Sequence, residues 1–388
     1  MIDLLIVEDE PDELKSWEQV IEMHNANADE LGFRITPAYA SSLEEAKGLI
    51  ASRNYDAAVV DVRLKQENGP TGPNTDGNLV LEALLESEMT VVALFTGEAP
   101  LAAKPAWAQK VVEIFRKGGE EDEGTPAVMR WLCAQSPMIK QIKLAHQTIK
   151  REMAKVFFHS IWPRWNNWSQ PAGTTADFIP TAITRHITSH IYAALLSGGP
   201  HGVHPEEWYF VPPLHDKINT GDLVRNLDGS IEIVITPRCD LQRDGKNETI
   251  QLATCKDVSV EWEKRCAKIT AAELALQNHT LPAGDKGIQK YEDAVHQAND
   301  KLRQFTQHSN SNVFHFLPRM KTIDESEMGP FYVQFDKIRS VTRNSDEAMA
   351  IQKDHRIASL TSEFLPSLVE RLGSFFSRIG TPDYSHPD

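Results

Sequence analysis

The chain has 388 residues, of which 41% are hydrophobic and 24% charged, a composition typical of globular proteins long enough for two or three domains. Its four cysteines include no Cys-x-x-Cys pair, which argues against a disulfide scaffold or a zinc ribbon and predicts a reducing, cytoplasmic compartment. The first residues carry no basic cluster and the apolar runs are short, so we expect neither a signal peptide nor a membrane span.

The negative charge is concentrated in the first third of the chain. Residues 1–126 hold 25 Asp and Glu against 10 Lys and Arg, whereas residues 127–388 hold 30 of each. The whole formal net charge of −15 therefore belongs to the first part. An acidic domain repels nucleic acid at long range, so we expect no nucleic-acid partner.

Strand and helix patterns alternate along residues 1–126. Runs of small and β-branched residues without alternation indicate strands that are buried on both faces. Such runs occur at residues 4–7, 35–39, 57–61, 90–95 and 111–115, and helical spacing occurs at residues 11–23, 43–52 and 78–85. This order predicts an α/β domain with a doubly wound, five-stranded parallel sheet.

Charged and polar side chains stand at the ends of four of these strands. Glu8 and Asp9 follow the first strand, Asp61 ends the third, Thr96 follows the fourth and Lys117 follows the fifth. In open α/β sheets, ligands bind at the carboxyl ends of the strands. Three carboxylates at one edge favour a cation, and a hard oxygen site with few protein ligands suits Mg²⁺. A carboxylate left partly free can attack phosphorus, while a hydroxyl and an ammonium bind the phosphoryl oxygens.

In these residues the chain resembles the receiver domain of two-component response regulators, over roughly its first 120 residues. The resemblance implies a flavodoxin-like sheet, Mg²⁺ as the cofactor and a sensor histidine kinase as the partner. It also implies a role for each residue: Asp61 as phosphoacceptor, Glu8 and Asp9 as the acidic metal pair, Arg63 as donor of a backbone carbonyl to the metal, Thr96 as switch hydroxyl and Lys117 as the family's lysine. Each residue alone also fits a turn, a cap or a solvated charge; the full set in this order favours the receiver site.

The chain departs from the receiver pattern at three places. Residues 65–75 form an insertion rich in Gly, Pro and Asn, which delays Asp76-Gly77 and predicts a loop that gates the site. Gly118-Gly119 stands where a proline is usual, and Ile114, with Phe115 beside it, stands where many receivers carry a switch aromatic. We expect phosphoryl transfer to survive these changes and the usual Thr/aromatic relay to be altered.

Residues 127–200 read as a helical linker. A helix begins at Pro126, a longer one spans residues 137–161 with apolar side chains at spacings of three, four and seven, and a third spans residues 177–196. Residues 127–160 hold six basic side chains and one acid, Glu152. A basic amphipathic helix of this kind either forms a homodimer through residues 137–161 or packs on a neighbouring domain.

Residues 201–388 predict an α+β output domain with a small β-rich core. Short strand patterns lie at residues 208–211, 222–225, 231–236, 250–255, 312–317 and 331–335, with a polar helix at 285–307 and a last helix at 363–379. A small barrel interrupted by helices is one arrangement that these patterns allow. No helix-turn-helix or phosphate-binding glycine loop occurs here.

Thr236-Pro237-Arg238-Cys239-Asp240 is the most site-like stretch of the C-terminal region. Cys239 is a candidate nucleophile with His315 or His215 as base, and Cys239, Asp240 and His315 are a candidate metal group. A buried cysteine at a strand end and an aspartate in a turn explain the same residues.

The leading hypothesis is a response regulator that accepts a phosphoryl group on Asp61 from a histidine kinase and switches a C-terminal output domain that does not bind DNA. Catalysis would then be limited to its own phosphorylation and dephosphorylation. One alternative is a phosphate-buffering or partner-binding regulator of an antiphage kinase system, by analogy with Detocs. The other is an enzyme effector that uses Cys239 and Asp240.

Overall fold

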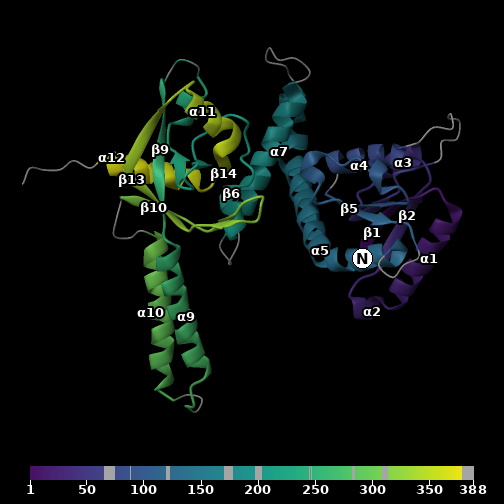
Figure 1. Ribbon diagram of the computed structural model, residues 1–388, viewed down its shortest axis with the longest axis horizontal. Helices are drawn as coiled ribbons and strands as arrows, with labels where there is room; N and C mark the ends of the chain where they lie inside the picture. Colours follow the sequence, from purple (N-terminus) through teal and green to yellow (C-terminus); the bar gives the residue numbers. More distant parts are fainter. Residues whose placement is uncertain are drawn as a thin grey trace, which may run out of the picture. The chain divides into compact units, whose positions relative to one another are not determined.

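The computed structural model describes residues 1–64, 75–87, 89–118, 123–169, 178–196, 203–243, 245, 247–281, 285–307 and 313–377. The chain divides into two compact units, Met1–Gly199 and Pro200–Asp388 (Figure 1). The predicted insertion loop at residues 65–75 lies, except for Thr75, outside the described residues. Among the described helices, none is long and apolar enough to cross a membrane.

The first unit is built on a parallel sheet of five strands in the order β2-β1-β3-β4-β5 (Figure 1). The strands are β1 (Ile2–Val7), β2 (Ile35–Ala40), β3 (Ala57–Val60), β4 (Val91–Thr96) and β5 (Glu113–Arg116). β1 pairs with β2 on one side, where Ile2 lies opposite Ile35, and with β3 on the other. This is the flavodoxin-like order, and its direction changes between β1 and β3, where such sheets bind ligands. The predicted doubly wound parallel sheet is confirmed.

Helices cover both faces of this sheet and explain its continuous apolar strands. They are α1 (Pro11–Ala26), α2 (Ala28–Leu31), α3 (Leu43–Ser52), α4 (Asp76–Ser87) and α5 (Gly124–Val156). One core contains Leu5 of β1 and Leu81 of α4, and the other contains Ile6 of β1, Trp17 of α1 and Leu132 of α5. Neighbouring side chains of β1 are thus buried on opposite faces, as in sheets that are covered on both sides.

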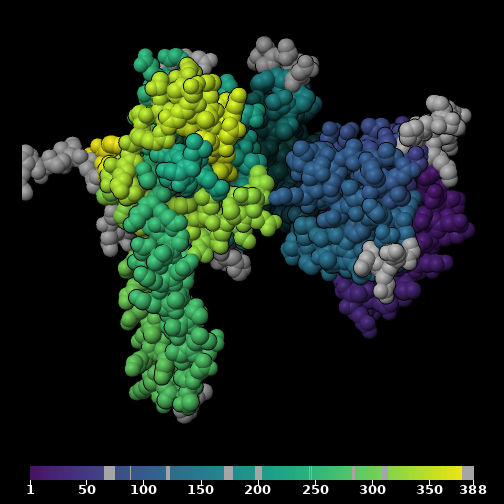
Figure 2. Space-filling model, viewed as in Figure 1, coloured from purple at the N-terminus to yellow at the C-terminus, as the bar shows by residue number. Residues whose placement is uncertain are grey.

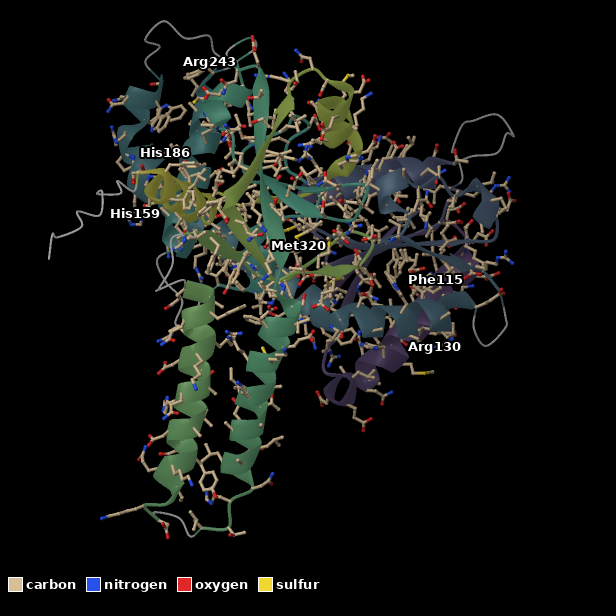
Figure 3. All side chains as sticks on the ribbon, turned by 60° about the vertical axis from the view of Figure 1, so that its left-hand side comes forward. Phe115, Arg130, His159, His186, Arg243 and Met320 are labelled. Atoms are coloured by element: carbon tan, nitrogen blue, oxygen red, sulfur yellow. The ribbon has the colours of Figure 1, made fainter. Side chains whose placement is uncertain are left out.

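The connection between β4 and β5 holds only two short 3₁₀ turns, η1 (Ala99–Leu101) and η2 (Ala106–Ala108). Trp107 in this connection is 67% exposed. On β5, Phe115 packs edge-on against Trp131 of α5, with ring centroids 5.8 Å apart (Figure 3 labels Phe115). β5 therefore contacts α5 through this pair of aromatic rings.

The helix α5 runs without interruption through Pro137, so the prediction of two helices that meet there was wrong. Proline removes one helical hydrogen bond, but Leu132 and Ile139 on either side of it are buried, and their packing holds the helix together. The chain continues through η3 (Phe157–Ile161), η4 (Trp162–Arg164) and α6 (Trp165–Ser169) to α7 (Phe178–Leu196). A hydrogen bond of 2.8 Å joins Ser160 Oγ to His186 Nε2 of α7. The predicted linker therefore lies in the same compact unit as the sheet.

The second unit contains a seven-stranded sheet in the order β10-β13-β9-β8-β7-β14-β6. Its strands are β6 (Tyr209–Phe210), β7 (Asp222–Arg225), β8 (Ile231–Val234), β9 (Thr249–Asp257), β10 (Phe314–Leu317), β13 (Phe331–Thr342) and β14 (Arg356–Leu360), and β11 (Met320–Lys321) pairs separately with β12 (Glu327–Met328). All neighbouring strands are antiparallel. The α+β prediction is confirmed, but the sheet is open with β10 and β6 at its edges, so the barrel arrangement was wrong.

Helices pack on the second sheet, and two of them form a projecting hairpin. The helical elements are η5 (Pro205–Trp208), α8 (Arg238–Leu241), α9 (Ser259–Gln277), α10 (Ile288–Gln307), α11 (Asp346–Ala350), η6 (Ile351–His355) and α12 (Leu365–Phe376). Leu368 of α12 is buried on one face of the sheet and Ile351 of η6 on the other. In the chain, the hairpin of α9 and α10 connects β9 to β10, and it extends away from the body of this unit (Figures 1 and 2).

Candidate functional site

The site lies at the carboxyl edge of the first sheet, where the strand pairing extends one residue beyond the strands. The Asp61 N–H donates to the carbonyl of Val7 at 2.8 Å, and the Lys117 N–H donates to the carbonyl of Thr96 at 3.2 Å. These backbone bonds place Asp61 beside the end of β1 and Lys117 beside the end of β4. Glu8 follows β1 directly. Residues from four strands thus meet at one edge, as the order of the strands requires.

Lys117 connects the two buried carboxylates of the site. Its Nζ lies 2.7 Å from Asp61 Oδ2, 2.9 Å from Glu8 Oε1 and 2.8 Å from Glu8 Oε2. The Arg63 N–H donates to Asp61 Oδ1 at 3.3 Å, so Asp61 is held by both of its oxygens. These contacts fix the positions of the carboxylate oxygens of two side chains that are both buried.

Three carboxylates gather around this lysine. Glu8, Asp9 and Asp61 each offer an oxygen, and these atoms lie within 4.8 Å of one another; no other such group of three Asp, Glu, His or Cys occurs among the described residues. Glu8 is 1% exposed and Asp61 5%. The buried Glu8 Oε2 has the Lys117 ammonium beside it but accepts no hydrogen bond. Three carboxylates against one ammonium leave negative charge, and this all-oxygen donor set fits a hard divalent cation such as Mg²⁺.

Burial shifts the pKa values of all three central groups. Burial raises the pKa of Glu8 from 4.5 to about 7, against the opposing effect of Lys117. Burial also raises the pKa of Asp61, although hydrogen bonds from Lys117, Arg63 and Thr96 oppose this. For Lys117, burial lowers the pKa, but the hydrogen bonds to Asp61 and Glu8 outweigh it and the pKa is raised. The lysine therefore stays charged while the carboxylates compete for it.

Three neighbours complete the site, and two of them escaped the sequence analysis. Glu10 Oε2 lies 3.9 Å from Lys117 Nζ, and the Arg63 guanidinium pairs with Glu98 at 2.5 Å where both side chains are about half exposed. Only their positions just after β1 and β4 point to these two acids. Gly77, noted in the sequence, is the second residue of α4 and lies against Asp61; a Cβ there would lie 1.9 Å from the Asp61 carbonyl oxygen.

Thr96 is buried at the end of β4, and its Oγ1 accepts a hydrogen bond from the Glu98 N–H at 3.2 Å. The structure thus brings together, at one edge of the sheet, the strand-end residues that the sequence analysis named. The first unit has the flavodoxin-like fold that response regulator receiver domains share. We call it the receiver unit.

Several solved structures that are similar to about a third of this chain are receiver domains. A CheY-like receiver domain from Methylobacillus flagellatus is 20% identical with a TM-score of 0.25, and the match covers 34% of this chain and 98% of that one. A response regulator from Thermotoga maritima in complex with Mg(2+)-BeF is 23% identical, with a TM-score of 0.22 and 31% and 91% covered. The receiver domain of an HD domain-containing protein from Pseudomonas fluorescens Pf-5 is 19% identical, with a TM-score of 0.24 and 38% and 96% covered.

At these identities the likeness is one of fold. No protein-family model matches the sequence, and no curated protein matches it. The roles of individual residues of the receiver unit therefore depend on the geometry described above.

The candidate site of the C-terminal unit is not assembled as the sequence analysis proposed. Cys239 is exposed on α8, and within the described residues its Sγ has one hydrogen-bond partner, Asp240 Oδ1 at 3.5 Å. His315 is buried on the edge strand β10, and β13 and β9 separate β10 from β8, the strand that precedes α8. His215 is exposed in a loop, and its backbone carbonyl accepts a hydrogen bond from the Arg356 guanidinium. Cys239, Asp240 and His315 form no metal group, so that interpretation was wrong.

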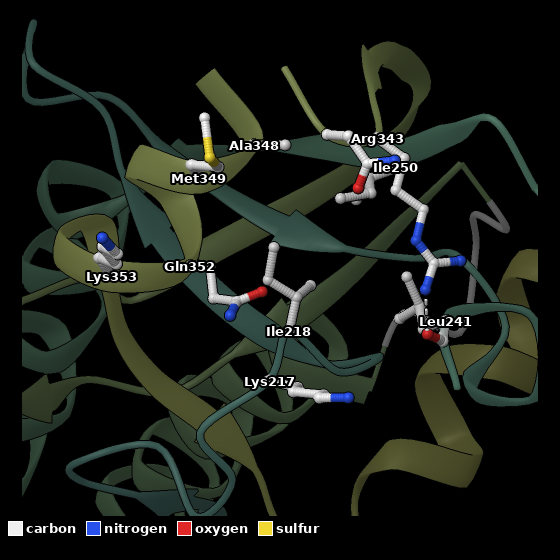
Figure 4. Close-up of a pocket in the computed structure, with 10 residues that line it drawn as sticks. Lys217, Ile218, Leu241, Ile250, Arg343, Ala348, Met349, Gln352 and Lys353 are labelled. Carbon is white, nitrogen blue, oxygen red and sulfur yellow. Dashed lines mark hydrogen bonds between the residues drawn. The ribbon is translucent and has the colours of Figure 1, made fainter. Parts of the chain in front are cut away.

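A pocket of about 330 Å³ lies beside α8 in the same unit (Figure 4). Ile218, Leu241 and Ile250 give it an apolar floor, and Arg343 reaches across it to donate to the Leu241 carbonyl at 2.6 Å. Cys239 and Asp240 are not among its lining residues. Arg343 thus serves to fix the end of α8.

Proposed function

We propose that the receiver unit accepts a phosphoryl group on Asp61, with Mg²⁺ held by Glu8, Asp9, Asp61 and the backbone carbonyl of Arg63. One observation supports this most: Lys117 Nζ lies 2.7 Å from Asp61 Oδ2 in a pocket that two further carboxylates share. A carboxylate fixed beside one ammonium and two acids is suited to nucleophilic attack on a phosphoryl group that arrives with a divalent cation.

The transfer forms a bond between an Asp61 oxygen and phosphorus while the bond from phosphorus to the donor's leaving group breaks. Bound Mg²⁺ would neutralise the charge on the phosphoryl oxygens and on the acidic pair. Lys117 then leaves its ion pair with the reacting oxygen and binds a phosphoryl oxygen, because the carboxylate charge moves outward onto the phosphoryl group. Thr96, buried at the end of β4, supplies a hydroxyl to a second phosphoryl oxygen.

The signal would leave the site through β4 and β5. Thr96 Oγ1 accepts a hydrogen bond from the Glu98 N–H at the start of the β4–β5 connection, so a movement of this hydroxyl toward the phosphoryl group would pull on that bond. The connection contains only 3₁₀ turns, and its neighbour Phe115 contacts Trp131 of α5. A nearly complete switch between two arrangements requires a preference of about 5.5 kcal/mol.

The partner that we propose is a sensor histidine kinase, whose phosphohistidine would supply the phosphoryl group. The C-terminal unit would be the output, and we propose that it does not bind DNA, since the chain is acidic and the sequence carries no helix-turn-helix signature.

We further propose that α5 forms a homodimer. Four apolar side chains of α5 at helical spacing, namely Met138, Ile142, Ile149 and Met153, are 36% to 48% exposed. A second copy of the same helix would cover this stripe with apolar side chains of its own.

Phosphorylation with acetyl phosphate and Mg²⁺, followed by intact mass measurement, tests the function. We expect the mass of one phosphoryl group on the full chain, its absence when EDTA is present throughout the reaction and its absence in Asp61→Asn. Asp56→Asn is the matched control, because Asp56 precedes the same strand at its other end and also pairs with a lysine, Lys143, at 2.6 Å. An unlabelled wild-type chain, or equal labelling of Asp61→Asn, would contradict the proposal.

A further inference from the structure

The hairpin of α9 and α10 is a firmly anchored arm. At its base Trp262 of α9 stacks on Phe316 of β10 with ring centroids 5.7 Å apart, and Phe305 of α10 packs on Tyr332 of β13 at 5.0 Å. The Tyr332 hydroxyl also donates to the Phe305 carbonyl at 2.9 Å. These contacts fix the direction of the arm relative to the sheet, while the rest of its length is solvated (Figures 2 and 3).

The two helices contact each other along one seam. On α10 the seam consists of Ile288, Tyr291, Val295, Ala298, Leu302 and Phe305, which alternate spacings of three and four. On α9 the same spacing gives Trp262, Arg265, Ile269, Ala272 and Leu276. This is the pattern of an antiparallel coiled coil. The residues that flank the seam on each helix therefore form two opposite, exposed faces of the arm.

The two faces carry opposite charge. One face, which we call the basic face, carries Lys264 and Lys268 of α9 and Lys290 and Lys301 of α10, with one acid, Glu261, at its base and small residues between the lysines: Ala271, Ala275 and Ala294. The other face carries Glu263, Glu273 and Glu292 together with one cation, Arg303. A groove of about 380 Å³ between the helices is lined by Lys264, Arg265, Lys268 and Lys301, so these four cations lie close together at the base of the arm.

Salt bridges within the described part of the chain do not account for the lysines of the basic face. In the described part of the chain, none of Lys264, Lys268 and Lys301 forms an ion pair, and Lys264 and Lys268 repel each other at a spacing of four on one helix. On the opposite face, by contrast, Glu263 pairs with Arg319 at 2.9 Å. A set of like charges that opposes folding and has no partner in its own unit indicates an external one.

We propose that the basic face binds an acidic helical segment of a protein partner. A third helix can lie along the groove with its carboxylates toward Lys264, Lys268 and Lys301, and farther along the arm Ala271, Ala275 and Ala294 leave room for its backbone. Nucleic acid fits less well, because residues 1–199 hold 27 acidic and 18 basic residues and residues 200–388 hold 28 and 22, so both units repel a long polyanion. The groove also offers no exposed aromatic ring for base stacking, since Arg265 lies over the Phe305 ring at 4.2 Å.

Fluorescence anisotropy with the full chain tests this. The probe is a fluorescein-labelled helical peptide of alternating Glu and Ala pairs, compared with the same peptide carrying Lys for Glu and with a single-stranded oligodeoxynucleotide of equal negative charge. The variant is Lys264→Glu/Lys268→Glu/Lys301→Glu. The matched control is Lys321→Glu/Lys337→Glu/Lys353→Glu, which changes the net charge equally at exposed lysines outside the hairpin.

We expect the Glu peptide alone to bind, with affinity reduced at least tenfold in the hairpin variant and less than threefold in the control. Circular dichroism and thermal unfolding of both variants establish that the hairpin remains folded. Equal loss in the two variants would show that only net charge matters and would overturn the proposal. Tighter binding of the oligonucleotide, or no binding of the Glu peptide at low salt, would also overturn it. Neither result bears on phosphorylation of Asp61.

Discussion

Lys117 and Asp61 are 56 positions apart in the sequence, and Lys117 Nζ lies 2.7 Å from Asp61 Oδ2. The same ammonium lies 2.8 Å from Glu8 Oε2, so a single cation is shared by two buried carboxylates. Such an arrangement is stable only while the ammonium is present or another cation replaces it. The proposed Mg²⁺ would be a second cation for the same carboxylates, and the first two predictions follow from that competition.

Removal of the Lys117 charge should strongly destabilise the metal-free receiver unit. In Lys117→Met the side chain keeps its bulk, but two buried carboxylates lose their cation, which costs about 3 to 5 kcal/mol of unfolding free energy. Urea unfolding in EDTA measures this, and Mg²⁺ should restore more stability to the variant than to the wild type. Lys15→Met is the control, since Lys15 pairs with Asp12 at the surface and its loss should change little. Equal effects of the two substitutions would refute the prediction.

Mg²⁺ affinity should rise with pH through neutrality. Glu8 has a pKa of about 7 in the folded, metal-free protein, raised from 4.5 by burial, so a proton competes with the ion. Affinity should increase about tenfold from pH 6 to pH 8 by fluorescence or calorimetric titration. Without metal, Glu8 keeps its proton up to about pH 7 in the folded state but loses it near pH 4.5 in the unfolded chain. The unfolding free energy should therefore fall as the pH rises from 4.5 to 7. Glu8→Gln should remove both dependences; a pH dependence that persists in this variant would exclude Glu8 as its source.

The receiver fold was predictable because its strands are buried on both faces. Leu4, Leu5 and Ile6 are apolar without alternation, and each such run ends abruptly at a polar residue. Those end residues became neighbours because all five strands are parallel, so the positions of Glu8, Asp61 and Lys117 followed from the strand order. The charges around them did not follow, since Glu10 and Glu98 lie in loops whose paths no periodicity determines.

The C-terminal unit was less predictable for two physical reasons. The helix α9 escaped notice because Arg265 interrupts its apolar seam, and the guanidinium is accommodated only by stacking on Phe305, a residue 40 positions later. The strand β13 was predicted to end at Phe335, but it continues to Thr342 through a change of register after Gln334. Contacts that depend on distant partners leave little signal in the local sequence.

Gly77 should be irreplaceable at the start of α4. An alanine Cβ would lie 1.9 Å from the Asp61 carbonyl oxygen and 2.7 Å from Val62 Cα, and neither backbone atom can rotate away. We expect Gly77→Ala to lower the unfolding free energy by about 3 kcal/mol and to slow phosphorylation by acetyl phosphate, because the end of β3 must move. Gly48→Ala in α3 has no atom within 4 Å of the new Cβ and should stabilise by about 1 kcal/mol. Chemical unfolding of both variants decides; similar effects of the two would mean that the backbone contact at Gly77 is unimportant.

The α5 stripe should determine the oligomeric state. Ile149 is 36% exposed on the stripe with Met138, Ile142 and Met153, whereas Leu144 is 57% exposed on another side of the same helix. If two copies pair through the stripe, Ile149→Glu places two like charges in an apolar interface, and the dissociation constant should rise at least 100-fold, or about 2.7 kcal/mol. Leu144→Glu changes the charge of the helix equally and should leave the dimer intact. Sedimentation or light scattering over a range of concentrations distinguishes these results, and a wild-type chain that stays monomeric at high concentration would remove the dimer from the proposed function without affecting the phosphoryl site.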